Sequence, residues 1–374
     1  MKVLVAGDFC PRAQVAEAFE CGDYQMVLNE VKSFFASSDY SIVNLECPVT
    51  NGPEKPIAKL GNNLHCSKRG IDALKWMGCN CVTLANNHFY DYGDAGVKNT
   101  LEGCRAAGID TVGGGENIME ASMILYKQIA GQTLAVINCC EREFSIATKT
   151  SGGSNPINPI RQFYAIREAR SKADFVLVII HGGHEHFQLP SPRMVETYRF
   201  FVDAGADAVV NHHQHCYSGY EVYHGKPVFY GLGNFCFAPG RRKVQSTWFD
   251  GFFIVIEFLK ENASFTIHPY RQCEGKPKIE VLEQNAFDKE IKRLNSIIAD
   301  PNALFRVVED YYISSSDSIS NIFEPIRNRF YLGFRRRGWL PSLISQNRKL
   351  AAADYISCEA HRDRLLSWLR NGNH

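Results

Sequence analysis

Half of the histidines in this sequence of 374 residues lie in two short windows. The sequence holds 12 histidines, and six of them occur in HGGHEH at 181–186 and NHHQHC at 211–216. Each window follows a continuous apolar run, FVLVII or AVV, of the kind that forms a strand buried on both faces. Local structure gives no reason to place so many imidazoles there. We therefore expect them to share a partner elsewhere in the chain.

Carboxylate and amide side chains follow three other apolar runs. Asp8 comes after KVLVAG, Glu46 after YSIVNL, and NNH at 86–88 after CVTLA. Because α/β sheets bind ligands outside the carboxyl ends of their strands, we expect these residues to converge on the two histidine windows. Two carboxylates, an amide oxygen and several imidazoles can hold two divalent transition metals. Such a pair can activate water as a nucleophile and stabilise the attacked and leaving oxygens.

The elements that must position these residues are also visible in the sequence. Amphipathic segments such as GVKNTLEGCRAAG and PRMVETYRFFVDAG separate the apolar runs, and each ends at a glycine in the C-cap position. Strands that alternate with helices predict an α/β domain with a mostly parallel sheet, which we place at residues 1–280. From about residue 281 the strand runs stop. NAFDKEIKRLNSIIAD and EAHRDRLLSWLRN predict a helical C-terminal appendage over 281–374.

Composition narrows the class of protein. The net charge of +1 gives no reason to expect a nucleic-acid partner. No apolar stretch reaches the roughly 18 residues that would span a bilayer, and the first apolar stretch, of about five residues, is too short for a signal peptide. The 13 cysteines are an odd number and are scattered, which predicts free thiols in a cytoplasmic protein.

Six motifs together resemble a known family. GDF, NLECPVT, LANNHFYDYG, HGGHEH, NHHQH and YGLGNF occur in the order seen in the CapA/PgsA-like capsule and poly-γ-glutamate synthesis proteins, which look like relatives of the calcineurin-like metallophosphoesterases. The resemblance covers about residues 1–270. It implies an α/β/β/α sandwich of two sheets flanked by helices. It also implies a metal-dependent enzyme with two Mn, Fe or Zn ions that makes or tailors a cell-surface polymer.

The resemblance also implies a role for individual residues. The implied metal ligands are Asp8, Glu46, Asn87, His181, His213 and His215. Glu46 would bridge the two ions, Asp8 and His215 would complete one site, and the other three ligands would complete the second. His88 would be the general acid, Asp91 would orient it, and Glu185 occupies an acidic position near the site. The residues expected to contact the substrate or to support the site are Asn86, His184, His186, Asn234, Arg241 and Arg242.

Three departures from the phosphoesterase pattern keep alternatives open. Asp8 is followed by Phe9 and Cys10 rather than by the usual Asp-x-His, so the first site lacks a ligand unless Cys10 substitutes. Glu46 stands in the place of a bridging Asp, and Gln214 in the place of a Pro. The first interpretation is a phosphoester hydrolase. The alternatives are amide, peptide or proton-abstraction chemistry on the same scaffold, and a non-catalytic accessory subunit of a polymer synthase.

The expected partners follow from charge and from one aromatic segment. The substrate is expected to be anionic or derived from the polymer, and GRRK at 240–243 either binds it through Arg241 and Arg242 or is a solvated loop. The segment RNRFYLGFRRRGWLP at 327–341 mixes five arginines with four aromatic residues. It could dock on an anionic inner-membrane surface or on a synthase subunit. Alternatively, it is a packed helix whose arginines extend to solvent.

Overall fold

The computed structural model describes residues 1–59, 61–259, 263–323 and 328–357. The chain divides into two compact units, Met1–Phe305 and Arg306–His374. Among the described residues, no helix is both long enough and apolar enough to cross a membrane. The helix predicted over 359–371 lies outside the described residues.

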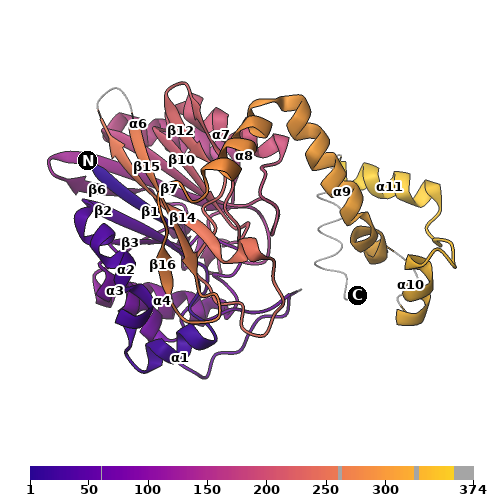
Figure 1. The fold of residues 1–374 in the computed structure, drawn as a ribbon, viewed down its shortest axis with the longest axis horizontal. Coiled ribbons are helices and arrows are strands. Elements are labelled where there is room, and N and C mark those ends of the chain that lie inside the picture. Colours follow the sequence, from indigo (N-terminus) through magenta and orange to yellow (C-terminus); the bar gives the residue numbers. More distant parts are fainter. Residues whose placement is uncertain (60, 260–262, 324–327, 358–374) are drawn as a thin grey trace. The chain divides into compact units, whose positions relative to one another are not determined.

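The first sheet of the larger unit contains the strands that precede Asp8, Glu46 and Asn87. Among the described residues its strands follow the order β16-β15-β14-β1-β2-β3-β4, with β13 paired to the end of β1 (Figure 1). Strands β1 to β4 run parallel, and β14 to β16 are antiparallel to their neighbours. The bounds are Lys2–Phe9 (β1), Tyr40–Leu45 (β2), Cys81–Thr83 (β3), Asp110–Val112 (β4), Asn234–Cys236 (β13), Asp250–Phe258 (β14), Ala263–Gln272 (β15) and Ile279–Val281 (β16).

The second sheet contains the strands that precede the two histidine windows. Its order is β11-β12-β10-β9-β7-β6, in which β7, β9, β10 and β12 are parallel and the edge strands β6 and β11 are antiparallel. The bounds are Leu125–Ile129 (β6), Gln132–Cys140 (β7), Phe175–His181 (β9), Ala208–His212 (β10), Tyr220–Tyr223 (β11) and Lys226–Phe229 (β12). Two short strands, Gly114–Gly115 (β5) and Gly153–Ser154 (β8), pair with each other in a separate antiparallel two-stranded sheet. The central strands are fully buried, as their continuous apolar runs predicted.

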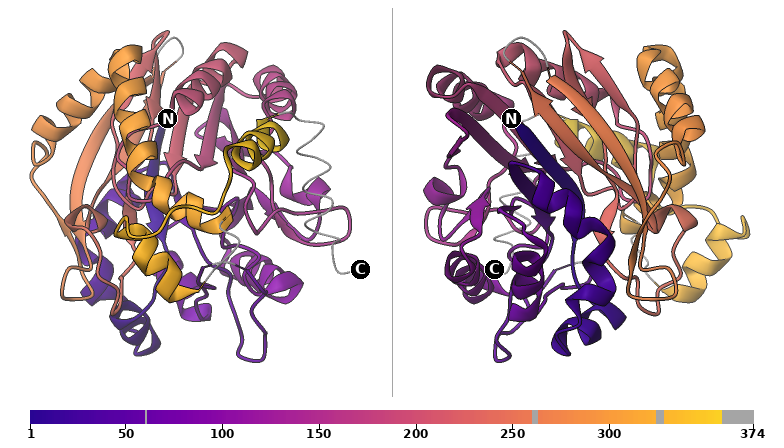
Figure 2. Two further views of the ribbon diagram at one scale, coloured as in Figure 1. Left: turned by 90° about the vertical axis from the view of Figure 1, so that its right-hand side faces the viewer. Right: turned by 60° about the vertical axis from the view of Figure 1, so that its left-hand side comes forward.

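Helices cover the outer faces of both sheets. Helices α1 to α4 share one hydrophobic core with the first sheet, whereas α6 and α7 contact the second (Figures 1 and 2). The bounds are Gln14–Glu20 (α1), Tyr24–Ser37 (α2), Lys68–Met77 (α3), Gly93–Ala107 (α4), Ile118–Ala121 (α5), Pro159–Lys172 (α6) and Pro192–Ala204 (α7). The amphipathic stretch at 15–35 forms two helices rather than one, because Gly22 turns the chain with φ of +77°.

The inner faces of the two sheets meet through aromatic side chains. Phe175 on β9 stacks on Phe258 of β14 with ring centroids 5.1 Å apart. Phe229 on β12 contacts the rings of Phe252 and Phe265 at 6.3 and 5.0 Å. Aromatic pairs of this kind stabilise a core beyond the area that they bury. The molecule therefore has the predicted α/β/β/α architecture.

Among the described residues, helices α8 to α11 follow β16. Helix α8 (Asp288–Ala299) belongs to the larger unit and contacts β11, where Asn295 Oδ1 accepts a hydrogen bond from the backbone N–H of Tyr220 at 2.7 Å. This packing extends the larger unit to Phe305, beyond the boundary at residue 280 that the sequence suggested. The remaining helices are α9 (Pro301–Phe323), α10 (Arg329–Arg336) and α11 (Gln346–Ser357).

Candidate metal centre

The expected metal ligands lie at the carboxyl ends of strands in both sheets. Asp8 is on β1 and His181 ends β9. Glu46 and His213 follow β2 and β10 directly, and Asn87 and His215 lie a few residues beyond the ends of β3 and β10. Asp8 pairs in register with Asn44 on one side and Asn234 on the other. After β10 the backbone takes left-handed conformations, with φ of +101° at His213 and +56° at His215. Left-handed backbone conformations are unfavourable for residues other than Gly, and such strained residues concentrate at functional sites.

Four of the expected ligands converge around the ring of His181. Its Nε2 lies 3.0 Å from Asn87 Oδ1, 3.0 Å from His213 Nδ1 and 3.5 Å from Glu46 Oε1. A single imidazole N–H can donate to only one of these atoms. The remaining lone pairs therefore face one another, which is the arrangement that a cation would stabilise.

The other two expected ligands lie beside Glu46. The ligand atoms of Asp8, Glu46 and His215 all fall within 4.8 Å of one another, and so do those of Glu46, His181 and His213. Glu46 is thus common to both groups. This is the position that the sequence resemblance implied for a carboxylate bridging two ions.

The environment of Glu46 tests whether these residues fit metal ions. Its side chain is fully buried, and among the described residues neither carboxylate oxygen has a hydrogen-bond partner. Burial, and then the nearby charge of Asp8, raise the pKa of Glu46 well above its ordinary value. A buried carboxylate without partners is strongly unfavourable unless a proton or a cation neutralises it. The donor set therefore fits divalent cations.

The imidazoles are in the form that binds metals. Burial, followed by the proximity of His213, lowers the pKa of His181 and of His215 well below the ordinary value. Both rings are therefore neutral at physiological pH, and neutral imidazole is the ligand form.

The comparison with known proteins places this chain in a family. Residues 2–239 match the family described as bacterial capsule synthesis protein PGA_cap. The chain belongs to this family. It is 32% identical over 288 residues to the capsule biosynthesis protein CapA of Bacillus anthracis, covering 74% of this chain and 69% of that protein. It is 31% identical over 296 residues to the PGA biosynthesis protein CapA of Bacillus subtilis, covering 77% and 76%. The predicted family is thus confirmed.

More distant similarities are weaker. A probable polyglutamine synthesis accessory protein of Mycobacterium tuberculosis is 25% identical over 221 residues, covering 53% of this chain and 55% of that protein. A putative 5'-nucleotidase from Staphylococcus aureus, solved in complex with alpha-ketoglutarate, matches with a TM-score of 0.44 and 16% identity, covering 79% of this chain and 58% of that chain.

Two asparagine side chains, those of Asn44 and Asn234, contact the expected ligands in this member of the PGA_cap family. Asn44 donates to Asp8 Oδ1 at 2.7 Å, and its amide nitrogen lies 3.3 Å from His181 Nδ1. Asn234 Oδ1 lies 2.9 Å from His215 Nδ1, and its Nδ2 donates to two backbone carbonyls. Asn234 is fully buried, so it holds His215 in place and does not contact substrate. Sequence reasoning missed Asn44, which lies inside the apolar run YSIVNL.

His88 lies beside the ligands, next to a buried acid and a buried base. Its Nδ1 is 2.6 Å from Asp91 Oδ2, as expected for a residue that orients the ring. Lys59 forms an ion pair with Asp91, and its Nζ lies 3.1 Å from His88 Nδ1. Burial lowers the pKa of His88, and the hydrogen bond to Asp91 opposes this effect. Sequence reasoning missed Lys59, because it lies in an irregular segment without periodicity.

Asn86 forms hydrogen bonds to the backbone on either side of the site; the sequence predicted that it contacts the substrate or supports the site. Its Nδ2 donates to the carbonyl of Leu45 at 2.9 Å, and its Oδ1 accepts from the backbone N–H of His88 at 3.1 Å. The residue is fully buried, so neither end of the amide is left for a ligand. Cys10 is buried in the hydrophobic core beside Cys47. It belongs to neither ligand group found among the described residues.

The other expected residues form a partly exposed rim. Glu185 is 44% exposed in its side chain, with Oε2 3.8 Å from His186 Nε2. The ring of His186 lies 5.9 Å from that of His215. Burial lowers the pKa of His186, and the charge of Arg242 adds to this effect. His184 is half-buried, and this burial lowers its pKa, with a smaller contribution from His213. Arg241 and Arg242 are exposed. The charges of Glu185 and Arg242 both act on His186.

Glu143, which the sequence analysis did not name, and His212, from the second histidine window, also lie near the ligands. Glu143 accepts a hydrogen bond from Asn87 and contacts His213. The rule applied to the other strands would have found it, because ERE at 141–143 follows the run TLAVINCC. His212 is buried with Nδ1 3.7 Å from Asp8 Oδ1, and among the described residues neither ring nitrogen has a hydrogen-bond partner.

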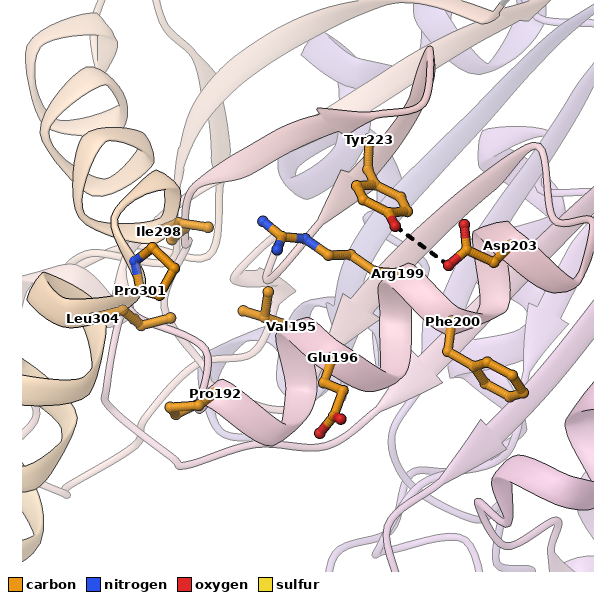
Figure 3. Close-up of a pocket in the computed structure, with 10 residues that line it drawn as sticks. All are labelled: Pro192, Val195, Glu196, Arg199, Phe200, Asp203, Tyr223, Ile298, Pro301 and Leu304. Atoms are coloured by element: carbon orange, nitrogen blue, oxygen red, sulfur yellow. Dashed lines mark hydrogen bonds between the residues drawn. The ribbon is translucent and has the colours of Figure 1, made fainter.

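A separate cavity lies away from these ligands. It has a volume of about 490 Å³ and is bordered by α7, by Tyr223 of β11 and by the end of α8 and start of α9 (Figure 3). Tyr223 donates to Asp203 at 3.3 Å there. The cavity contains none of the expected metal ligands, so it is distinct from the metal centre.

Proposed function

We propose that this member of the PGA_cap family is a dinuclear-metal hydrolase that acts in capsule or poly-γ-glutamate biosynthesis. The observation that carries the proposal is Glu46, whose two buried oxygens lack hydrogen-bond partners among the described residues and which belongs to both ligand groups. We propose Mn, Fe or Zn as the ions, because imidazole and carboxylate together suit these metals.

We assign separate roles in the proposed reaction to the metals, to His88 with its partners, and to the exposed arginines. A pair of divalent metals, when bound, supplies an activated water and stabilises negative charge that develops on the substrate. When its ring is protonated, His88 would give a proton to a leaving oxygen from Nε2, because its Nδ1 is held by Asp91. The ion pair between Lys59 and Asp91 holds that carboxylate in place. Arg241 and Arg242 on the rim suit an anionic substrate, such as a phosphoester.

The cluster around His88 favours catalysis over a purely accessory role. A metal site that only stabilises a fold has no use for a buried imidazole held by an acid and a lysine at its edge. The printed name of the mycobacterial relative includes "accessory protein", which keeps the accessory role as the rival to test. Amide or peptide chemistry remains the rival within enzymes, since the same metals polarise carbonyl groups.

The test uses the full chain loaded with each metal in turn. Bound metal is counted by elemental analysis, and hydrolysis is followed with an aryl phosphate monoester, an aryl phosphate diester and a γ-glutamyl anilide. We expect about two ions per chain and ester hydrolysis that disappears in His88→Ala. Hydrolysis of the anilide alone would move the assignment to amide chemistry. A metal-loaded chain that hydrolyses none of the three would refute the hydrolase and leave the accessory role.

We also propose that the segment at 328–341 contacts an anionic membrane surface. Between residues 328 and 349 the chain has six basic residues and no acidic residue. Phe330 and Trp339 are 68% and 66% exposed, which is unusual for such large apolar side chains. Arginine and interfacial aromatic residues together suit a surface of anionic lipid headgroups.

A further inference from the structure

The carboxylate of Glu143 reaches two ligands of the same metal group. Its Oε2 accepts a hydrogen bond from Asn87 Nδ2 at 3.1 Å, and its Oε1 lies 3.5 Å from His213 Nε2. The opposite polar atoms of these two side chains, Asn87 Oδ1 and His213 Nδ1, each lie 3.0 Å from His181 Nε2. Each ligand therefore turns one polar atom to the metal group and the other to Glu143.

Both of these ligands could present the wrong atom. An amide that rotates by half a turn offers N–H groups in place of its oxygen, and an N–H group cannot bind a cation. A neutral imidazole carries its proton on either nitrogen, and only the nitrogen without the proton can bind a metal. An ionised carboxylate only accepts hydrogen bonds. The carboxylate of Glu143 would therefore favour the amide orientation of Asn87 and the tautomer of His213 that leave Asn87 Oδ1 and His213 Nδ1 free to bind the metal.

The backbone before Glu143 is fixed to the end of β9. The N–H of Glu141 donates to the carbonyl of His181 at 2.9 Å, and Glu141 Oε2 accepts from the N–H of Gly183 at 3.1 Å. Glu141 also forms an ion pair with Arg193. The strand pairing between β7 and β9 places Cys140 opposite His181. The loop is thus anchored to the same strand end that supplies a ligand, which gives Glu143 a defined position.

We propose that Glu143 is a positioning residue for the metal site formed by Glu46, His181 and His213. It fixes the amide of Asn87 and the tautomer of His213, and it does not bind the ion itself. The inference rests on the proposed function, because it assumes that this second ion binds. Partners that orient metal ligands in this way affect metal affinity by roughly 10- to 100-fold.

The test measures metal affinity, which requires no knowledge of the substrate. Zn²⁺ is titrated by calorimetry, with a competing chelator, into the metal-free full chain and into Glu143→Gln. Glutamine has the same shape but one acceptor and one donor, so it must misdirect either Asn87 or His213. We expect one Zn²⁺ to bind as in the wild type and the other to bind roughly 10- to 100-fold more weakly. Glu143→Ala, in which water can serve as the acceptor, should lose less affinity than Glu143→Gln.

The matched control is Glu185→Gln. Glu185 is an exposed carboxylate on the same rim, and its charge also acts on Glu46, but no hydrogen bond joins it to Asn87 or His213 among the described contacts. It should bind both ions with affinities close to those of the wild type. Equal losses in the Glu143 and Glu185 variants would mean that only charge matters, and the positioning role would be wrong.

Further outcomes separate this inference from the proposed function. If Glu143→Gln binds both ions like the wild type, or weakens both equally, Glu143 does not position one site. If it loses one ion as completely as His213→Ala does, Glu143 is itself a ligand, which also overturns the proposal. If the wild type binds no second Zn²⁺, the dinuclear function fails first. Melting temperatures of the metal-free variants establish that each one is folded.

Discussion

Removal of the metals should make the stability of the folded chain fall as the pH rises. Asp8 is buried, and desolvation raises its pKa from 3.8 to about 7 in the metal-free protein, although Asn44 and the N–H of His213 oppose the change. The folded state therefore holds a proton that the unfolded chain releases near pH 4. The contribution of Asp8 to the free energy of unfolding is highest below pH 4. It declines as the pH rises toward 7.

The size of the effect follows from the two pKa values. Each pH unit between them is worth about 1.4 kcal/mol, so the change from 3.8 to about 7 amounts to roughly 4 kcal/mol. This is a large part of the total stability of an ordinary protein, which is about 5–15 kcal/mol. The loss should be complete somewhat above pH 7.

The assay compares melting temperatures between pH 4 and 8.5 after treatment with a chelator. Metal-free wild type should lose stability steadily with rising pH. Asp8→Asn should have a flatter profile, because the side chain cannot ionise, although Glu46 contributes to both profiles. Added Zn²⁺ should restore the wild type at pH 8 but not Asp8→Asn. Glu102→Gln, which changes an exposed carboxylate on α4, should follow the wild type.

The reasoning would be wrong if the metal-free wild type and Asp8→Asn gave parallel profiles over this range. That outcome would mean that Asp8 titrates alike in the folded and unfolded chains. Its carboxylate would then be accessible to water rather than enclosed with Glu46.

Three further predictions concern the metal centre and the C-terminal region. His88→Ala should retain both ions by elemental analysis yet lose roughly 10²- to 10⁴-fold in turnover, as expected for a general acid; equal loss of metal would make it a ligand. His213→Ala should lose one ion. At ion concentrations about 100 times the Kd, this variant should also lose about 2.7 kcal/mol of the stabilisation that metal gives the folded state, measured by unfolding with and without metal. Trp339→Ala should weaken sedimentation with vesicles that contain anionic lipid, and equal binding to neutral vesicles would contradict the electrostatic part of the proposal.

The sequence predicted the strands that are buried on both faces and the ligands that follow them. Runs such as YSIVNL and FVLVII are short and rich in β-branched residues, which favours a strand covered on both sides over a buried helix, and both are fully buried strands. Because neighbouring parallel strands end at the same edge of a sheet, residues that follow these runs in the sequence are expected to lie close together in space. The long strand β15 was missed, since exposed and buried residues mix along ASFTIHPYRQ and no continuous apolar run marks it.

The residues that support the ligands were harder to predict. Lys59 reaches His88 from a segment with no regular secondary structure, where the path of the chain depends on tertiary contacts. Asn44 flanks Asp8 through strand register, which no local pattern reveals. The same limit explains Asn86, whose position beside a ligand suggested contact with substrate. Only the hydrogen bonds to Leu45 and His88 show that its amide is already used.

Each ligand group draws on both sheets of the sandwich. Glu46 follows β2 of the first sheet, whereas His181 and His213 belong to the second, and the group of Asp8, Glu46 and His215 is divided in the same way. Neither sheet alone could hold an ion tightly, so affinity appears only when the two sheets have docked against each other. Bound ions would then act as cross-links between two layers that are otherwise joined mainly by aromatic packing. Metal supply would in that case govern how readily the sandwich opens, and a metal-starved cell would hold a chain whose layers separate more often.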